Sequence, residues 1–202
     1  MAPEPEEHAC FGSSMSVSGD LIVIGEPFAT VEDTFRVGKA YLYNMEGEHL
    51  QTFVSPVTKL NGRFGDSIAI DGEVIVVGEW DAHVSPGQYE GRAYVFDVDG
   101  NLLQNLTAPD PFPRAAFGIS LDIQGDVIVV GESWAGSGEL GQTGRVHVFK
   151  LGASVEVQEP VEEITTETEE TETETNGGIP GFPIMSILTA LVIYYIIREW
   201  TK

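Results

Sequence analysis

Short apolar runs separated by glycine turns fill the first three quarters of the chain. In the middle of this region, residues 67–70 and 74–77 are two apolar-rich runs joined by the turn signal Asp71-Gly72. Because glycine readily takes the positive φ of a tight turn, this pattern predicts a β-hairpin. Residues 74–77 are apolar at every position, so we expect both faces of that strand to be covered.

Two further strands are predicted after this hairpin. Residues 91–96 form a strand pattern beyond a variable loop, and a second turn signal, Asp99-Gly100, leads into residues 102–106. Four strands within about 50 residues predict an antiparallel four-stranded sheet, which is the blade of a β-propeller.

The same pattern occurs three times with a period of 53 residues and without insertion or deletion. Each copy opens with Phe-Gly, reaches Gly-Glu 14 residues after the phenylalanine, and has a further glycine 13 residues later. These markers are Phe11, Phe64 and Phe117, then Gly25, Gly78 and Gly131, then Gly38, Gly91 and Gly144. We therefore predict an all-β fold of three four-stranded antiparallel blades in an incomplete or open propeller.

The repeat also divides the chain. The copies span residues 11–63, 64–116 and 117–155, and the third loses the pattern at residues 152–154, so we expect its fourth strand to be degenerate. Residues 1–10 align with the linker at 107–116, and we interpret them as the end of a preceding repeat. Closed propellers have roughly four to eight blades. We expect either a fragment of a longer protein, whose missing part holds more blades and a signal peptide, or self-association that completes a ring.

The order of these motifs resembles the FG-GAP repeat, the blade unit of integrin-alpha-type propellers and of many microbial surface proteins. The resemblance rests on the Phe-Gly pairs, on Val-Ile-Val-Val-Gly-Glu at 74–79 and on Gly-Arg-Val-x-Val-Phe at 144–149, and it covers residues 11 to about 155. It implies a β-propeller on a cell-surface protein. The chain has Gly-Glu where the family name has Gly-Ala-Pro. It also lacks the calcium loop Asp-x-Asp-x-Asp-Gly of integrin-type blades, so calcium has no support and we predict no cofactor.

The composition changes after residue 155. Residues 156–175 contain nine glutamates and no lysine or arginine, so we predict a disordered acidic stalk at 156–178. No charged residue occurs from Ile179 to Ile197, a length that crosses about 30 Å of hydrocarbon as a helix. We predict a transmembrane anchor at 179–198, and the positive-inside rule places residues 199–202 in the cytoplasm and the repeats outside the cell.

The start of this anchor carries a second resemblance. Ile-Pro-Gly-Phe-Pro at residues 179–183 resembles the C-terminal anchors of archaeal surface proteins, some of which have a Pro-Gly-Phe signal that a sorting enzyme processes. The resemblance implies an archaeal origin and a PGF-like anchor.

Charge and motifs exclude some classes of function. The formal net charge of −22 would repel a phosphate backbone, so we predict no nucleic-acid partner. The chain has no Gly-x-Ser-x-Gly, His-Glu-x-x-His or phosphate-loop motif, and we predict that it is not an enzyme. An extracellular hydrolase stays open as a lesser alternative, because propeller hydrolases build their sites from scattered residues.

Internal repetition separates scaffold positions from candidate sites. Residues that recur in every copy serve the blade, so Phe11, Phe64 and Phe117 are predicted to lie in the core. The glutamates of the Gly-Glu pairs, Glu26, Glu79 and Glu132, recur too, and we favour a structural hydrogen-bonding role over a shared metal ring. The single cysteine, Cys10, is interpreted as a packing residue.

The variable loops 27–37, 80–90 and 133–143 are where recognition is expected, because long loops on a rigid scaffold usually carry it. We predict that they open on the same end of the array as the connections between blades. The candidate ligand-binding residues form an aromatic and acidic patch for a sugar or protein: Trp80, Asp81, His83, Tyr89 and Trp134. The alternative is that Trp80 and Trp134 cap the apolar ends of their blades.

Two short motifs have simpler interpretations. Asp97-x-Asp99-Gly100 resembles the opening of a calcium loop, but its third acidic ligand is missing, so we predict an ordinary turn. Asn105-Leu106-Thr107 is an N-glycosylation sequon. Taken with the anchor, these features predict a membrane-anchored surface protein for recognition or adhesion. A structural envelope component without a specific ligand is the main alternative.

Overall fold

The structure is a computed structural model that describes residues 2–57, 60–85, 88–136 and 143–152. The predicted stalk at 156–178, the anchor at 179–198 and the tail at 199–202 lie outside these ranges. Within the ranges every regular element is a β-strand, which confirms the all-β prediction for this part of the chain. No helix among the described residues has the length and apolar character needed to span a membrane.

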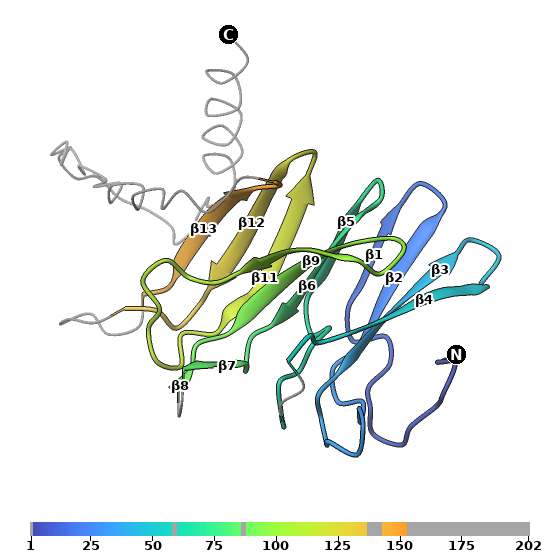
Figure 1. The fold of residues 1–202 in the computed structure, drawn as a ribbon, viewed down its shortest axis with the longest axis horizontal. Helices are drawn as coiled ribbons and strands as arrows, with labels where there is room; N and C mark the ends of the chain where they lie inside the picture. Colours follow the sequence, from blue (N-terminus) through green and yellow to red (C-terminus); the bar gives the residue numbers. More distant parts are fainter. Residues whose placement is uncertain (1, 58–59, 86–87, 137–142, 153–202) are drawn as a thin grey trace, which may run out of the picture. The chain divides into compact units, whose positions relative to one another are not determined.

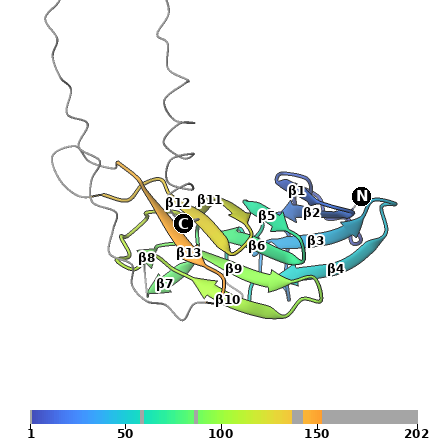
Figure 2. The same ribbon diagram turned by 90° about the horizontal axis from the view of Figure 1, so that it is seen from above.

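The strands form three antiparallel sheets in chain order, here called the first, second and third sheets (Figures 1 and 2). The first sheet contains β1 (Met15–Ser18), β2 (Leu21–Glu26), β3 (Lys39–Asn44) and β4 (His49–Val54). The second contains β5 (Ile68–Asp71), β6 (Val74–Glu79), β9 (Arg92–Asp97) and β10 (Leu102–Leu106). The third contains β11 (Phe117–Gln124), β12 (Val127–Glu132) and β13 (Arg145–Lys150). The predicted fourth strand of the third copy falls beyond residue 152, outside the described residues.

The sheets follow the 53-residue period closely. β2, β6 and β12 are six residues each and begin at Leu21, Val74 and Val127, one period apart. The turns before them contain Gly19, Gly72 and Gly125 at φ of 56°, 57° and 59°, as the turn signals predicted. A small hairpin of β7 (His83–Ser85) and β8 (Gln88–Tyr89) is inserted in the loop of the second sheet and was not predicted.

Neighbouring sheets pack face to face and share two apolar cores. The first core lies between the first and second sheets and includes Val23, Leu42, Phe64, Ile75 and Phe96. The second lies between the second and third sheets and includes Val76, Val95, Phe117, Ile128 and Val130. Because Ile75 and Val76 point to opposite faces and are both fully buried, β6 is covered on both sides, as predicted.

The three recurring phenylalanines differ in burial. Phe64 and Phe117 are fully buried between two sheets, which confirms the prediction for these two residues. Phe11 is only partly buried, so the prediction of a core position is wrong for it. Its ring packs against Tyr41 on the outer face of the first sheet, with centroids 5.7 Å apart. Among the described residues no further sheet lies over that face, and this leaves the ring half covered.

Cys10 is exposed, so its interpretation as a packing residue is also wrong. Cys10 and the equivalent residues Arg63 and Ala116 all have a left-handed backbone, at φ of 62°, 59° and 58°. The side chain of Arg63 reaches the loop of the preceding sheet, where it lies over Phe28. The described part of the chain places no such loop beside Cys10, and its thiol therefore faces solvent.

Hydrogen bonds between sheets repeat with the sequence. The hydroxyl of Ser14 donates to the carbonyl of Gly65 at 2.6 Å, and Ser67 donates to Gly118 at 2.5 Å. A Cβ added to Gly25 would lie 2.0 Å from the Gly65 carbonyl oxygen. Gly78 has the same relation to the Gly118 carbonyl, so the glycine is needed at these two Gly-Glu pairs, where the Phe-Gly turn of the next sheet presses against it.

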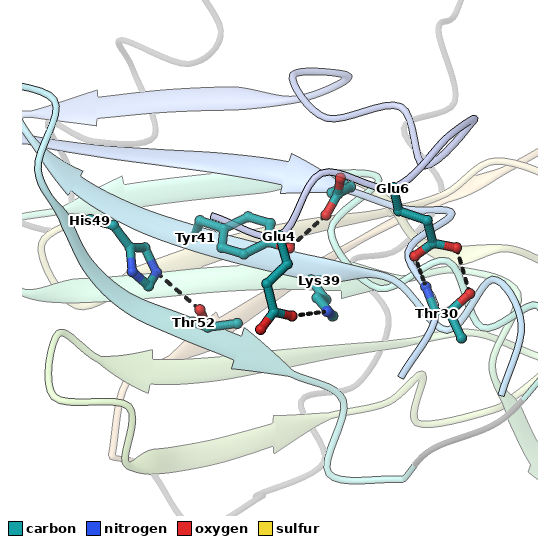
Figure 3. A network of polar contacts seen from close by, with 8 residues as sticks. Glu4, Glu6, Thr30, Lys39, Tyr41, His49 and Thr52 are labelled. Atoms are coloured by element: carbon teal, nitrogen blue, oxygen red, sulfur yellow. Dashed lines mark hydrogen bonds and ion pairs between the residues drawn. The ribbon is translucent and has the colours of Figure 1, made fainter. Parts of the chain in front are cut away.

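The N-terminal segment lies along the first sheet (Figure 3). The carboxylate of Glu6 accepts hydrogen bonds from the backbone N–H and the hydroxyl of Thr30, at 2.7 and 2.5 Å. The ammonium group of Lys39 lies 3.5 Å from the carboxylate of Glu4. The backbone N–H of Phe28 donates to Ala9, in the same way that Trp134 donates to Ala115 in the third sheet. Residues 2–10 thus occupy the place of a linker between blades.

Candidate functional site

Each sheet buries one glutamate at the end of its second strand. Glu26, Glu79 and Glu132 are at most 1% exposed. Each is bound to the residue at one equivalent position of the neighbouring strand: Tyr41 to Glu26 at 2.6 Å, Tyr94 to Glu79 at 2.9 Å, and His147 to Glu132 at 2.8 Å. The favoured hydrogen-bonding role is therefore what the structure contains. Within the described ranges, no group of three or more His, Cys, Asp or Glu side chains is placed to hold a metal ion.

Glu79 has the most perturbed environment of the three. Burial raises its pKa from 4.5 to about 7, against the hydrogen bonds from Tyr94 and Ser55 and the charge of Arg92, which lower it. Burial and the nearby Glu79 also raise the pKa of Tyr94 to about 12. Oε1 of Glu79 is buried without a hydrogen-bond partner among the described residues. Since no part of the group is accessible, its chemistry concerns folding rather than a ligand.

The variable loops and the connections between sheets gather at one end of the array, as predicted. In Figure 1 the hairpin β7–β8 and the loop between β2 and β3 lie at the lower edge, and the turns β1–β2, β5–β6 and β11–β12 lie at the upper edge. Backbone hydrogen bonds tie a connection to a loop: Asn61 N–H donates to the Phe35 carbonyl, and Arg63 N–H donates to the Arg36 carbonyl. This end is hereafter called the loop end.

Aromatic and arginine side chains alternate across the loop end. The guanidinium carbon of Arg36 lies 5.3 Å from the ring centre of Phe35 and 5.4 Å from that of Phe28. That of Arg63 lies 5.5 Å from Phe28 and 4.5 Å from Trp80. The rings of Trp80 and Trp134 meet edge to face at 5.6 Å. We call this set the aromatic–arginine row: Phe35, Arg36, Phe28, Arg63, Trp80 and Trp134.

The middle of the row is held rigidly and its ends are exposed. The indole N–H of Trp80 donates to the carboxylate of Asp66, and Arg63 forms an ion pair with Asp81 at 3.7 Å. Each cation–aromatic contact falls within the roughly 6 Å at which such pairs attract. Trp134 is 41% exposed and Phe35 is 55% exposed. The row therefore has exposed aromatic residues at its two ends, Trp134 and Phe35, and between them Arg63 and Trp80, which internal contacts hold in place.

The structure brings together part of the predicted patch. Arg63 contacts both Trp80 and Asp81, and Trp80 contacts Trp134. His83 and Tyr89 are paired backbone positions in the hairpin β7–β8. Trp80 is partly exposed and contacts Asp66, Arg63 and Trp134, so the alternative that it caps the apolar end of its blade stays open. These tests leave the ligand-binding role of the patch a prediction.

Sequence reasoning missed four members of the row: Phe28, Phe35, Arg36 and Arg63. A signal for them was present in the repeat. Arg63 stands where the other copies have Cys10 and Ala116, so it is not a scaffold residue. Phe28 likewise stands where the others have Asp81 and Trp134. Comparing copies position by position, rather than loop by loop, would have selected them.

The two short motifs behave simply. Asp97 accepts hydrogen bonds from the backbone and side-chain N–H groups of Asn101, and the side-chain bond from Asn101 helps to lower its pKa. This is the predicted turn. Asn105 lies in β10 with an exposed side chain, and glycosylation there stays a prediction.

Comparison with known families agrees with the repeat. Residues 54–96 and 101–149 each match the family model of the FG-GAP repeat. No curated protein gives a significant match to the chain. The two matched segments and the three antiparallel sheets agree with the blades of a β-propeller.

Proposed function

We propose that the protein is a membrane-anchored cell-surface protein that recognises or adheres to an extracellular protein or glycan through its loop end. The observation that carries the proposal is the aromatic–arginine row, because its members differ between the copies of the repeat. Residues that hold a blade together recur, whereas a single ligand needs a set of side chains that occurs once.

The chemistry of the row suits recognition. Tryptophan and arginine dominate binding energy where they sit on a rigid support, and open aromatic rings stack on sugar rings or on apolar side chains. Arg36 is exposed and adds hydrogen-bond donors next to the open ring of Phe35. The ion pair of Arg63 with Asp81 keeps the base of the row in place without the ligand.

Display outside the cell is the second part of the proposal, and the sequence supports it. The uncharged run from Ile179 to Ile197 would anchor the chain, and the Glu/Thr-rich segment 156–178 would hold the sheets away from the membrane. The basic Arg198 and Lys202 favour a cytoplasmic C-terminus. The Pro-Gly-Phe run makes an archaeal envelope the setting that we propose. Further blades and a bound ion are not needed for this role.

A structural envelope role without a ligand is the second candidate. It is favoured by the internal contacts of Trp80 and Arg63, which stabilise the loops whether or not a ligand binds. The two candidates differ in what the exposed ends of the row do.

Replacing Trp134 separates these candidates. Trp134→Ala removes an exposed ring, so we expect about tenfold or more weaker binding to cells and to arrayed glycans, with an unchanged circular dichroism spectrum. The matched control is Met45→Ala, because Met45 is 57% exposed on a tight turn away from the loop end. If Trp134→Ala and the parent chain bind every surface and glycan equally, the recognition role is wrong and the structural one stands.

A further inference from the structure

On the outer face of the first sheet, β1 carries exposed apolar side chains, and no further sheet lies over it among the described residues. Met15 and Val17 in β1 are 66% and 59% exposed. One repeat later, Ile68 and Ile70 are buried against the first sheet. The outer face of the first sheet is therefore the same kind of surface that the second sheet uses to contact its neighbour.

The outer face of the third sheet is the complementary surface. Val146 and Val148 in β13 are 70% and 49% exposed. One repeat earlier, Ala93 and Val95 are fully buried against the third sheet. Exposed apolar surface of this kind marks a site for another protein surface. The two ends of the array thus carry the two halves of the interface that is already made twice inside it.

Polar groups at the two ends match as well. Inside the array the Ser67 hydroxyl donates to the Gly118 carbonyl, and the Asp71 carboxylate accepts from the Gly125 N–H at 2.6 Å. One repeat later, Ser120 and Gln124 present the same kinds of groups on the third sheet, and both are exposed. Gly12 and Gly19 of the first sheet are equivalent to Gly118 and Gly125, two repeats earlier. The Gly12 carbonyl could therefore accept, and the Gly19 N–H donate, the same hydrogen bonds.

Space for a Phe-Gly turn is also present on the third sheet. A Cβ on Gly91 would lie 2.1 Å from the backbone of Phe117, because that turn presses against it. At the equivalent Gly144 the nearest atom would be the Ser133 carbonyl oxygen at 3.2 Å. Among the described residues, nothing beside the third sheet takes the place that Phe117 fills between the second and third sheets, and Phe11 of another first sheet would fit there.

We infer that the partner of these faces is a second copy of this chain, joined head to tail, so that the third sheet of each copy packs on the first sheet of the other. Two copies then supply six sheets, within the four to eight that close a propeller. A heterologous contact of this kind forms a ring when its rotation closes, and a two-fold axis makes both contacts identical. The inference is independent of any ligand at the loop end.

The charge of Asp122 on this face is compatible with the contact. Asp122 stands where Ser16, in the first sheet, accepts a hydrogen bond from the Ile70 N–H at 3.2 Å. A carboxylate accepts the same bond, and its donor would be the N–H of Val17 in the other copy. Asp122 and Val17 are therefore expected to lie next to each other across the new contact.

The first test measures the mass of the full 202-residue chain in detergent micelles. Light scattering corrected for detergent is expected to give twice the 21.9 kDa of one chain. Val148→Glu and Val17→Glu each place a charge in the contact and are expected to give the mass of one chain. The matched control is Leu103→Glu, since Leu103 is 48% exposed on an outer strand of the middle sheet, and it is expected to keep the double mass.

The second test is cross-linking, which does not depend on a disruptive variant. In a Cys10→Ser background, chains with Val17→Cys are mixed with chains with Asp122→Cys and oxidised. Head-to-tail packing predicts a disulfide-linked dimer from the mixture and none from either variant alone. Circular dichroism checks that all variants keep the β-sheet spectrum.

Each other outcome overturns the inference. A parent chain with the mass of one chain at every concentration would mean that something else covers these faces, such as further repeats or another segment of the chain. A disulfide from Val17→Cys alone would mean that two first sheets meet face to face. A mass of three or more chains would mean that six sheets do not close the ring.

Discussion

The buried glutamates show how a single buried carboxyl group affects the stability of the fold. A carboxyl group in an apolar surrounding resists ionisation, and each one here is retained with a hydrogen-bonding neighbour on the next strand. Burial raises the pKa of Glu79 to about 7. Its free Oε1 has no donor among the described groups, so the charged form is poorly compensated.

This gives a prediction about pH. The unfolded group has a pKa near 4.5 and the folded group near 7, so between these values the folded state holds the extra proton. The free energy of unfolding should therefore fall by about 3 kcal/mol as pH rises from 4.5 to 7, and then level off. In Glu79→Gln this contribution should be absent, because glutamine does not titrate, and only a smaller fall from Glu26, whose pKa burial also raises, should remain. Urea unfolding at several pH values between 4.5 and 8 measures it.

The control for this experiment is Glu73→Gln. Glu73 lies in the exposed turn between β5 and β6, so its replacement should leave the pH dependence of the parent chain unchanged. Equal pH dependence of Glu79→Gln and the parent chain would contradict the assigned protonation of the buried group.

At the scale of elements, the Phe-Gly turn and the glycine that it presses on explain the packing of one sheet on the next. A Cβ on Gly78 would lie 2.1 Å from the Gly118 carbonyl oxygen, which is backbone and cannot move alone. At the equivalent Gly131 the only close contact, at 2.2 Å, would be the hydroxyl of Ser120, which can rotate. The same substitution therefore has different consequences in two copies.

We expect Gly78→Ala to lower the free energy of unfolding by about 2 kcal/mol or more, through overpacking between the second and third sheets. Gly131→Ala should cost less than about 1 kcal/mol by itself. Both are measured by urea unfolding in a Val148→Glu background, so that self-association does not contribute. Equal losses in the two variants would show that the turn does not set the spacing of the sheets.

The strands could be predicted from the sequence because the same pattern of apolar runs and glycine turns occurs in three copies. The predicted run 74–77 became β6, Val74–Glu79, and the turns at Gly72 and Gly100 were correct. The contacts of the aromatic–arginine row could not be predicted in the same way. They depend on left-handed backbone at Arg36 and Arg63, φ of 55° and 59°, which residue type does not reveal.

On the scale of the whole molecule, charge opposes compactness. The 22 acidic residues of the segment 1–155 outnumber its eight basic residues, and like charges repel when they are brought together by folding or by association of two copies. Salt shortens the range of this repulsion, from about 30 Å at 0.01 M to about 8 Å at 0.15 M.

The melting temperature should accordingly rise by about 2–5 °C between these two salt concentrations, because screening removes part of the repulsion. Differential scanning fluorimetry in NaCl measures it, and CaCl₂ at matched ionic strength is the control. A much larger rise with calcium would contradict the prediction that no cofactor binds. A fall in melting temperature with NaCl would mean that attractive ion pairs outweigh the repulsion.

The stacking of the three sheets could be predicted from the sequence. What covers the outer faces of the first and third sheets could not. The period of 53 residues predicts that equivalent sheets pack on one another in chain order, and the two cores between the sheets confirm this. It does not predict what covers the outer side of Phe11 or Val148. A repeat describes how one copy packs on the next, and no further described sheet lies outside either residue.

The boundaries of the family match have a consequence for how such a chain could change length. Residues 54–96 run from the end of β4 to the end of β9, so the sequence unit straddles two sheets. Each 53-residue unit contains one Phe-Gly turn and two glycines, such as Gly25 and Gly38, that the Phe-Gly turn of the next unit contacts. Duplication or deletion of a whole 53-residue unit would therefore keep the same contact between neighbouring sheets. Recombination could in this way produce arrays with different numbers of sheets.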